Sequence, residues 1–481
     1  MAEADLKSKA IGGALWTAVE KFIRQGAQFV IGIVLARILA PDDYGIVGML
    51  AIFIAIANTF ADSGLSNALI QKQDCTDDDY STIFYFNVAV ALGCYALLFI
   101  SAPSVASFYE MPILTNVMRI VSLSIIISGL TAVQNTRLTK QLRFRLQSKI
   151  SIVSVFVTGA TGLTLAFRGW GVWALVFQAL AGQIFTSVCI WCYSKWIPKI
   201  RFSINSFRQL WRFGSKLLCS SLINTLYQNL YTLVIGKCFT PAQVGYYNRG
   251  NGYASIPVNT VTDMSLKVTY PILAKLQDDD ERLLRAYSKL LRMPLYVLYP
   301  ILTTIAVTSA PLIEFMIGEK WLPCAPLLSI LCIGGMFTPL TQINLNLLYV
   351  KGRTDLVLKL ELIKKPIAFL ILFASIPFGI IVMVVGKALY EFVAFSFNCY
   401  YTGKILNYGE LRQLRDLLPI FINCAVMAGV MAIAMTSVCS PWIKFIVAIP
   451  CGLFSYWIFS ILTKDTSYIE LKEILLKKLS L

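Results

Sequence analysis

The sequence predicts an all-α protein that crosses a membrane about fourteen times, built as two six-helix lobes followed by two further helices. Of its 481 residues, 57% are apolar and only 14% are charged, whereas soluble domains carry roughly 25% charged residues. Long apolar runs recur along the whole chain, and a short motif near residue 35 recurs near residue 235. These observations indicate a polytopic membrane protein with an internal duplication.

Fourteen segments are long and apolar enough to cross a hydrocarbon core about 30 Å thick. The first six are 12–35, 45–70, 83–103, 113–133, 150–167 and 172–193. The next six are 215–236, 253–270, 293–313, 325–350, 356–378 and 380–402, and the last two are 417–438 and 442–463. The connections between them are short, so we expect no soluble domain.

Basic residues gather in alternate loops between these segments. The richest are 134–149, 194–214, 271–292 and 351–365, and the tail after residue 463 is also basic. The positive-inside rule places these loops, and therefore both termini, in the cytoplasm. The net charge of +16 is thus interpreted as an orientation signal, and no nucleic-acid partner is expected.

The chain contains a repeat at an offset of 200 residues. Residues 35–46 read LARILAPDDYGI and residues 235–246 read IGKCFTPAQVGY. The aligned pairs are Arg37 and Lys237, Pro41 and Pro241, Gly45 and Gly245, and Gln28 and Gln228. We therefore expect two lobes, 1–200 and 201–405, and a remainder of two helices and a tail, 406–481. Lobes of equal orientation are related by an axis along the membrane normal, with the substrate path between them.

Segment 12–35 carries the charges Glu20, Lys21 and Arg24 at membrane depth. A charge there costs on the order of 2.5–3.5 kcal/mol, so it needs a partner or a water-filled cavity. Glu20 and Arg24 are spaced to pair on one helix face, but one carboxylate cannot neutralise two cations. Lys21 and Arg24 are therefore predicted to line a cavity; the alternative is that they are neutralised or reach the interface.

Other polar residues of the apolar segments are further candidates. Lys267 lies four residues after Asp263, and Lys387 four residues before Glu391, so both pairs suit one helix face. Gln28 and its repeat partner Gln228 are predicted to line the same path. The alternative for the glutamines is hydrogen bonding between helices.

No catalytic residue, metal site or cofactor is expected. The sequence has no histidine, which removes the commonest metal ligand and general base. Its twelve cysteines are scattered and mostly lie in apolar runs. The acidic runs 77–79 and 278–280 are interpreted as solvated loop residues rather than metal ligands.

Five stretches, in this order along the chain, resemble one known family. They are LARILAPDDYGIVGM at 35–49, FADSGLSNALIQKQD at 60–74, GWGVWALVFQ at 169–178, FMIGEKWLPCAPLLSIL at 315–331 and LLYVKGRTDLVLKLELIKK at 347–365. The chain resembles the polysaccharide transporters, or lipid-linked oligosaccharide flippases (Wzx-like), of the multidrug/oligosaccharidyl-lipid/polysaccharide exporter superfamily. Its fourteen-helix subgroup, of lipopolysaccharide or capsule biosynthesis proteins, looks most similar.

The resemblance implies a fold like that of the multidrug (MATE) exporters and a place in the bacterial cytoplasmic (inner) membrane. It implies movement of an undecaprenyl-pyrophosphate-linked oligosaccharide, an O-antigen, capsule or exopolysaccharide unit, by alternating access around a cationic cavity. Lys21 and Arg24 would meet the pyrophosphate, with Lys267 as the candidate of the second lobe. Pro41 and Gly45 of the motif are expected to shape the turn rather than touch substrate.

Two questions stay open at this point. Coupling to a proton or sodium gradient would use Glu20, Asp62 or Asp263, and the sequence does not choose among them. A MATE-like drug/cation antiporter is an alternative, although its cavity should favour acidic groups. A membrane-embedded glycosyltransferase or polymerase would need a catalytic carboxylate in a sizeable outer loop, and a non-transporting scaffold has no reason to keep charges at mid-membrane.

Overall fold

The computed structural model describes residues 2–62, 64–437, 440–463 and 465–479, and every regular element in these ranges is helical. The chain divides into two compact units, 1–245 and 246–481. The boundary falls inside a helix, before the last residue of the second copy of the repeat, 235–246. The lobe limits at 200 and 405 stay a prediction.

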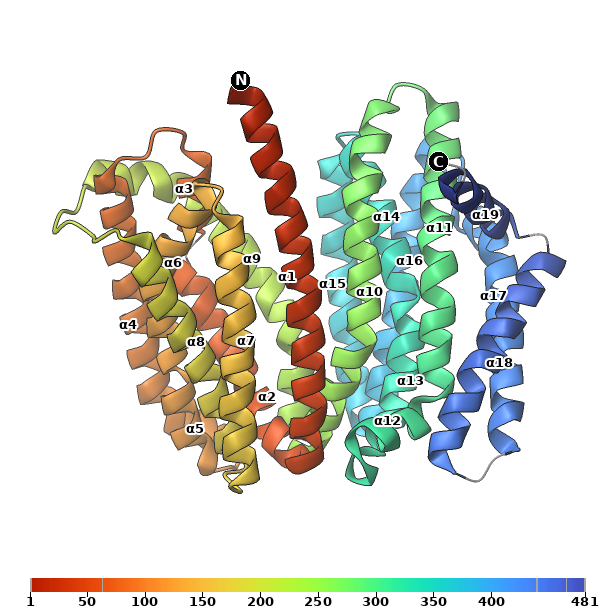
Figure 1. Cartoon of the computed structure of the whole chain (residues 1–481), viewed down its shortest axis with the longest axis horizontal. Coiled ribbons are helices and arrows are strands. Elements are labelled where there is room, and N and C mark those ends of the chain that lie inside the picture. The colour runs from red at the N-terminus through yellow and green to blue at the C-terminus, as the bar shows by residue number, and fades with distance from the viewer. Residues whose placement is uncertain (1, 63, 438–439, 464, 480–481) are drawn as a thin grey trace. The chain divides into compact units, whose positions relative to one another are not determined.

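The N-terminal unit is a bundle in which α1 packs along α7, α7 along α8, and α4 along α6 (Figure 1). Its helices are α1 (Ala2–Ile38), α2 (Pro41–Asp62), α3 (Leu65–Gln71), α4 (Asp77–Phe108), α5 (Ile113–Val121), α6 (Leu123–Lys140), α7 (Phe144–Phe167), α8 (Val172–Ser194), α9 (Ile204–Cys238) and the first residues of α10 (Pro241–Lys275).

The C-terminal unit contains the rest of α10, and in it α16 packs against α13, α14 and α15 while α17 packs against α18. Its other helices are α11 (Asp280–Val307), α12 (Ser309–Ile317), η1 (Glu319–Trp321), α13 (Cys324–Gly335), α14 (Phe337–Val350), α15 (Thr354–Ser375), η2 (Ile376–Phe378), α16 (Ile380–Leu406), α17 (Glu410–Thr436), α18 (Pro441–Leu462) and α19 (Thr466–Leu479).

The chain is a multi-pass membrane protein. Among the described residues, ten helical stretches are long and apolar enough to cross a membrane. The other four predicted segments lie in α1, α9, α10 and α15, which are 37, 35, 35 and 22 residues long but rich in charged or amide side chains. The all-helical membrane fold is thus confirmed, whereas the count of fourteen spans stays a prediction.

The repeated Pro–Gly motif lies where the first turns of α2 and α10 meet. Pro41 and Pro241 each begin a helix, the position where a missing N–H and a fixed φ are tolerated. A Cβ added to Gly45 would lie 1.8 Å from the carbonyl oxygen of Pro241, and one added to Gly245 would lie 2.2 Å from that of Pro41. The motif therefore allows a backbone-to-backbone contact, which agrees with its expected structural role.

The two acidic runs differ: residues 77–79 form the first turn of α4, which corrects the sequence analysis, whereas residues 278–280 are exposed and lie at the turn before α11, where only Asp280 belongs to the helix. Thr76 caps α4 in a capping box with Asp79. The side chain of Asp79 is 1% exposed and its Oδ2 accepts a 2.7 Å bond from Lys72 Nζ, so its interpretation as a solvated residue is wrong. Asp279 is itself the N-cap residue of α11, where its Oδ1 accepts a 3.0 Å bond from the Arg282 N–H, and it is solvent-exposed as expected.

Candidate functional site

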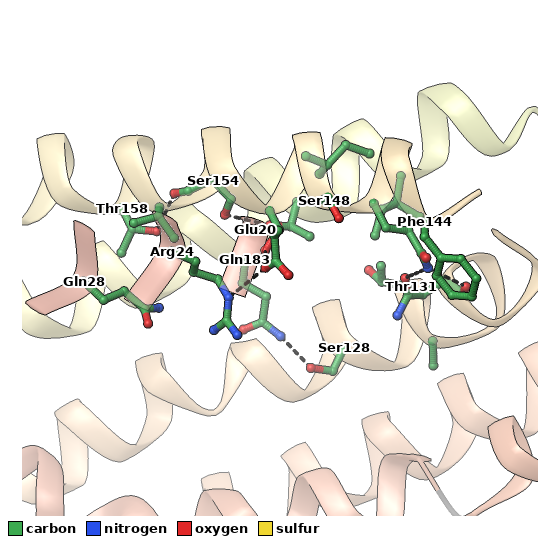
Figure 2. Close-up of a pocket in the computed structure, with 18 residues that line it drawn as sticks. Glu20, Arg24, Gln28, Ser128, Thr131, Phe144, Ser148, Ser154, Thr158 and Gln183 are labelled. Carbon is green, nitrogen blue, oxygen red and sulfur yellow. Dashed lines mark hydrogen bonds and ion pairs between the residues drawn. The ribbon is translucent and has the colours of Figure 1, made fainter. Parts of the chain in front are cut away.

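A polar cavity of about 600 Å³ lies inside the N-terminal unit, among α1, α6, α7 and α8 (Figure 2). Its polar lining consists of Glu20, Arg24 and Gln28 of α1, Ser128, Thr131 and Asn135 of α6, Gln147, Ser148, Ser151, Ser154 and Thr158 of α7, and Gln183 and Thr186 of α8. Hydroxyls and amides in a membrane bundle must be paired or hydrated, because lipid offers no hydrogen bonds. Their concentration here therefore indicates a place that can take a polar ligand or water.

One ion pair forms the charged part of this cavity. Arg24 Nε donates a 2.8 Å bond to Glu20 Oε1, which confirms the pairing predicted from the spacing. The same oxygen accepts a 2.7 Å bond from Ser151 Oγ, so the carboxylate joins α1 to α7. Within the described part of the chain, no partner is found for the two terminal amino groups of Arg24, whose side chain is 40% exposed. The guanidinium is thus oriented through Nε while its other donors remain able to bind an anion.

The opposite walls are connected by hydroxyl and amide contacts. Thr186 Oγ1 donates to Ser154 Oγ at 2.7 Å, and Ser154 Oγ donates to the Gly182 carbonyl at 2.9 Å, which joins α7 to α8. Gln183 Nε2 donates to the Ser124 carbonyl at 2.9 Å and to Ser128 Oγ, which joins α8 to α6. Hydroxyls can both donate and accept hydrogen bonds, so these walls can exchange partners with a hydroxyl-rich ligand.

The structure brings together Glu20, Arg24 and Gln28 but leaves the other predicted residues of this unit outside the cavity. Lys21 is exposed and does not line it, since adjacent residues point about 100° apart around a helix. Gln228 is exposed on α9, where its Nε2 donates to Asn224 Oδ1 at 3.4 Å. Asp62 is exposed at the end of α2 and accepts a 2.6 Å bond from Ser66 Oγ.

In the C-terminal unit, Asp263 and Lys267 are exposed on α10. A partly buried polar cluster of this unit lies instead around α16, beside a cavity of about 120 Å³ lined by both Lys387 and Glu391. Lys387 Nζ donates to Tyr247 Oη at 2.8 Å and to Asn251 Oδ1 at 2.9 Å. The sequence analysis noted Lys387 and Glu391 as a spaced pair but gave them no role.

The hydroxyl lining was missed by the sequence analysis because apolar runs conceal it. A signal was nevertheless present in α7, where Gln147, Ser151, Ser154 and Thr158 follow each other at intervals of four, three and four residues. That spacing places them on one helix face. A polar stripe in an otherwise apolar helix therefore predicts a lined cavity even without a charge.

Comparison with known proteins identifies the family. Residues 34–326 match the family described as "Polysaccharide biosynthesis protein". The lipopolysaccharide biosynthesis protein WzxC of Escherichia coli (strain K12) is 28% identical over 365 residues, which are 75% of this chain and 73% of that protein. The teichuronic acid biosynthesis protein TuaB of Bacillus subtilis (strain 168) is 27% identical over 353 residues, 73% of each chain.

A third relative and two solved structures extend these matches. The succinoglycan biosynthesis transport protein ExoT of Rhizobium meliloti (strain 1021) is 25% identical over 338 residues, 70% of this chain and 68% of that protein. The lipid II flippase MurJ in an inward closed conformation matches with a TM-score of 0.76 at 14% identity, covering 95% of this chain and 99% of that one. An inward-facing multidrug resistance MATE family transporter of the MOP superfamily matches with a TM-score of 0.59 at 14% identity, covering 83% and 100%. The structures share the fold, and the family match shows that this chain is a member of the polysaccharide biosynthesis protein family.

Proposed function

We propose that the chain moves an undecaprenyl-pyrophosphate-linked oligosaccharide across the bacterial cytoplasmic membrane by alternating access of two lobes. The names of its relatives support this: ExoT is a transport protein for succinoglycan biosynthesis, and MurJ, whose fold matches, is a flippase for lipid II. The partners of the chain are then the lipid-linked saccharide and the membrane lipids. Both termini lie in the cytoplasm, and the chain has no catalytic role.

The observation that carries the proposal is the polar cavity with Arg24 on one wall and hydroxyls on the others. A pyrophosphate cannot cross the hydrocarbon core unless positive groups neutralise its negative charge, because an unpaired charge in lipid is energetically costly. The planar guanidinium of Arg24 can bind phosphate oxygens through its terminal donors, while Glu20 and Ser151 hold its position. The hydroxyls of α6, α7 and α8 would replace water around the first sugar.

The remaining predicted residues keep their proposed roles outside this cavity. Lys21 and Lys267 add cations along the path, and Gln228 adds an amide that corresponds to Gln28. Energy would come from a proton or sodium gradient, with Glu20, Asp62 or Asp263 as the carrier. Protonation of Glu20 would weaken its hold on Arg24, which is one way to couple the ion to the substrate.

Complementation in a strain that lacks its own flippase tests the proposal, with surface polysaccharide as the readout at matched expression. Arg24→Ala should lower export roughly 10- to 100-fold, the equivalent of about 1.5–3 kcal/mol for a charge-assisted bond, and Arg24→Lys should retain part of it. Arg168→Ala, which removes an exposed cation after α7, is the matched control. Full export by the Lys21→Ala, Arg24→Ala double variant would refute the cavity assignment. Drug resistance without polysaccharide export would indicate a MATE-like antiporter.

A further inference from the structure

A second, larger groove lies in the C-terminal unit at one end of α15, α16 and α17. It has a volume of about 1100 Å³ and is lined by residues of all three helices and of the turn between α16 and α17. The turn is tight because Asn407 adopts the left-handed conformation with φ of 53°. It brings Lys404, at the end of α16, and Arg412, at the start of α17, to the same groove.

The groove carries an excess of positive charge. Lys359, Lys404 and Arg412 line it, and Glu410 is its one acidic lining residue. Glu410 Oε1 accepts a 2.8 Å bond from Ser396 Oγ. Among the residues that the structure describes, none of the three cations is in an ion pair. With three basic side chains and one carboxyl group, the lining of the groove has a formal net charge of +2.

Local contacts hold two of these cations without neutralising them. Lys404 Nζ lies 4.6 Å from the ring centroid of Tyr400, in a cation–π contact. Arg412 Nη1 donates a 2.5 Å bond to the Asn407 carbonyl. Both contacts leave donors on the ammonium and guanidinium groups for an anionic ligand.

The same groove borders exposed apolar surface. The lining residues Leu411 and Ile363 are 84% and 38% exposed. Leu358 and Leu362 of α15 do not line the groove but adjoin its lining residues in sequence, and they are 63% and 66% exposed. The basic stretch 351–365 includes the N-terminal part of α15, and the positive-inside rule places it on the cytoplasmic side. Cations, a tyrosine and exposed leucines together are typical of a helix end at the lipid head groups.

We propose that this groove binds an anionic phospholipid of the cytoplasmic leaflet. Its phosphodiester lies among Lys359, Lys404 and Arg412, and an acyl chain follows the leucines of α15. The charge selects an anionic over a zwitterionic head group, and the apolar wall selects a lipid over free phosphate. The lipid would connect α15, α16 and α17, a site distinct from the cavity proposed for the transported saccharide.

The test uses the full chain, purified in detergent, and measures retained lipid by native mass spectrometry during titration with phosphatidylglycerol or phosphatidylcholine. Each basic residue near an anionic surface strengthens binding on the order of fivefold. The K404Q, R412Q double variant should therefore bind phosphatidylglycerol roughly 25-fold more weakly, while K404R, R412K should retain most of the binding. Arg415→Gln, an exposed cation of α17 that does not line the groove, should change it little.

Several outcomes would overturn the proposal. One is that phosphatidylcholine binds as tightly as phosphatidylglycerol, and another is that excess inorganic phosphate displaces the bound lipid. A third is that Arg415→Gln weakens phosphatidylglycerol binding as much as the K404Q, R412Q variant does, which would indicate general attraction of the lipid to a basic surface. An unchanged affinity in the double variant would also overturn it. Melting temperatures of all variants show whether a loss reflects unfolding. None of these results depends on polysaccharide export, so the lipid site and the transport proposal can fail separately.

Discussion

Gly45, in the second turn of α2, is where one added methyl group should destabilise the N-terminal unit most clearly. Its Cβ would lie 1.8 Å from the carbonyl oxygen of Pro241 and 2.4 Å from the carbonyl carbon. Because real Cβ contacts essentially never fall below 3.0 Å, Gly45→Ala must move the two helix starts apart by at least the difference, 1.2 Å. Both sides of the contact are backbone, so no side chain can rotate to relieve it.

The expected cost follows from two opposing effects. Overpacking in a dense core costs about 1–3 kcal/mol, and a contact with backbone belongs at the upper end. Replacing glycine by alanine inside a helix, without a clash, stabilises the folded state by about 0.5–1 kcal/mol. The net destabilisation is about 2 kcal/mol, which corresponds to roughly 4–8 °C in the melting temperature of a unit of this size.

A thermal unfolding assay of the purified chain in detergent measures this effect. Gly26→Ala in α1 is the matched control, because nothing lies within 4 Å of the added Cβ, and it should leave the melting temperature unchanged or raise it. Gly245→Ala, whose Cβ would lie 2.2 Å from the Pro41 carbonyl oxygen, should behave like Gly45→Ala. The reasoning is refuted if Gly45→Ala melts at the wild-type temperature, or if Gly26→Ala lowers the melting temperature as much as Gly45→Ala does.

Two other contacts offer tests in the same assay. Ser151→Ala removes the 2.7 Å bond to Glu20 and should cost about 1.5–3 kcal/mol, because the acceptor is charged; Ser151→Thr should restore the melting temperature, and no loss in Ser151→Ala would contradict the structure. Asn344 and Gln413 exchange reciprocal amide bonds of 3.0 and 2.9 Å while fully buried. Gln413→Leu should therefore cost about 1–3 kcal/mol by leaving the buried Asn344 Oδ1 without a donor, while Asn344 Nδ2 keeps its bond to the Leu340 carbonyl. Adding Asn344→Leu should recover part of that loss, whereas strictly additive losses would show that the pair is not coupled.

Much of the fold could be predicted because membrane helices follow local rules. A helix in lipid must pair its own backbone groups, so apolar length alone indicates where most helices lie. The repeat at 35–46 and 235–246 indicated a duplication, and the spacing of Glu20 and Arg24 indicated their ion pair. Each of these properties depends on residues close together in the chain or on direct comparison of two stretches.

The candidate site could be predicted only in part. Lys21 and Arg24 have the same charge and lie three residues apart, yet only Arg24 lines the cavity. Which of the two residues faces the cavity depends on how α1 is rotated about its axis against α7, and this rotation cannot be read from hydropathy. Ser154 and Thr158 were overlooked because a hydroxyl in an apolar run usually bonds to its own helix, as Thr158 does with the Ser154 carbonyl at 2.8 Å.

By itself the sequence determined the membrane class, the helical architecture, the family and the presence of charges that need compensation. The tertiary structure decided which side chains share a cavity, that Gly45 and Gly245 face the backbone of Pro241 and Pro41, and that Lys404 and Arg412 line one groove. The physical reason is that composition and periodicity act along one helix. A binding site, by contrast, depends on the rotation and contact of several helices, which packing alone decides.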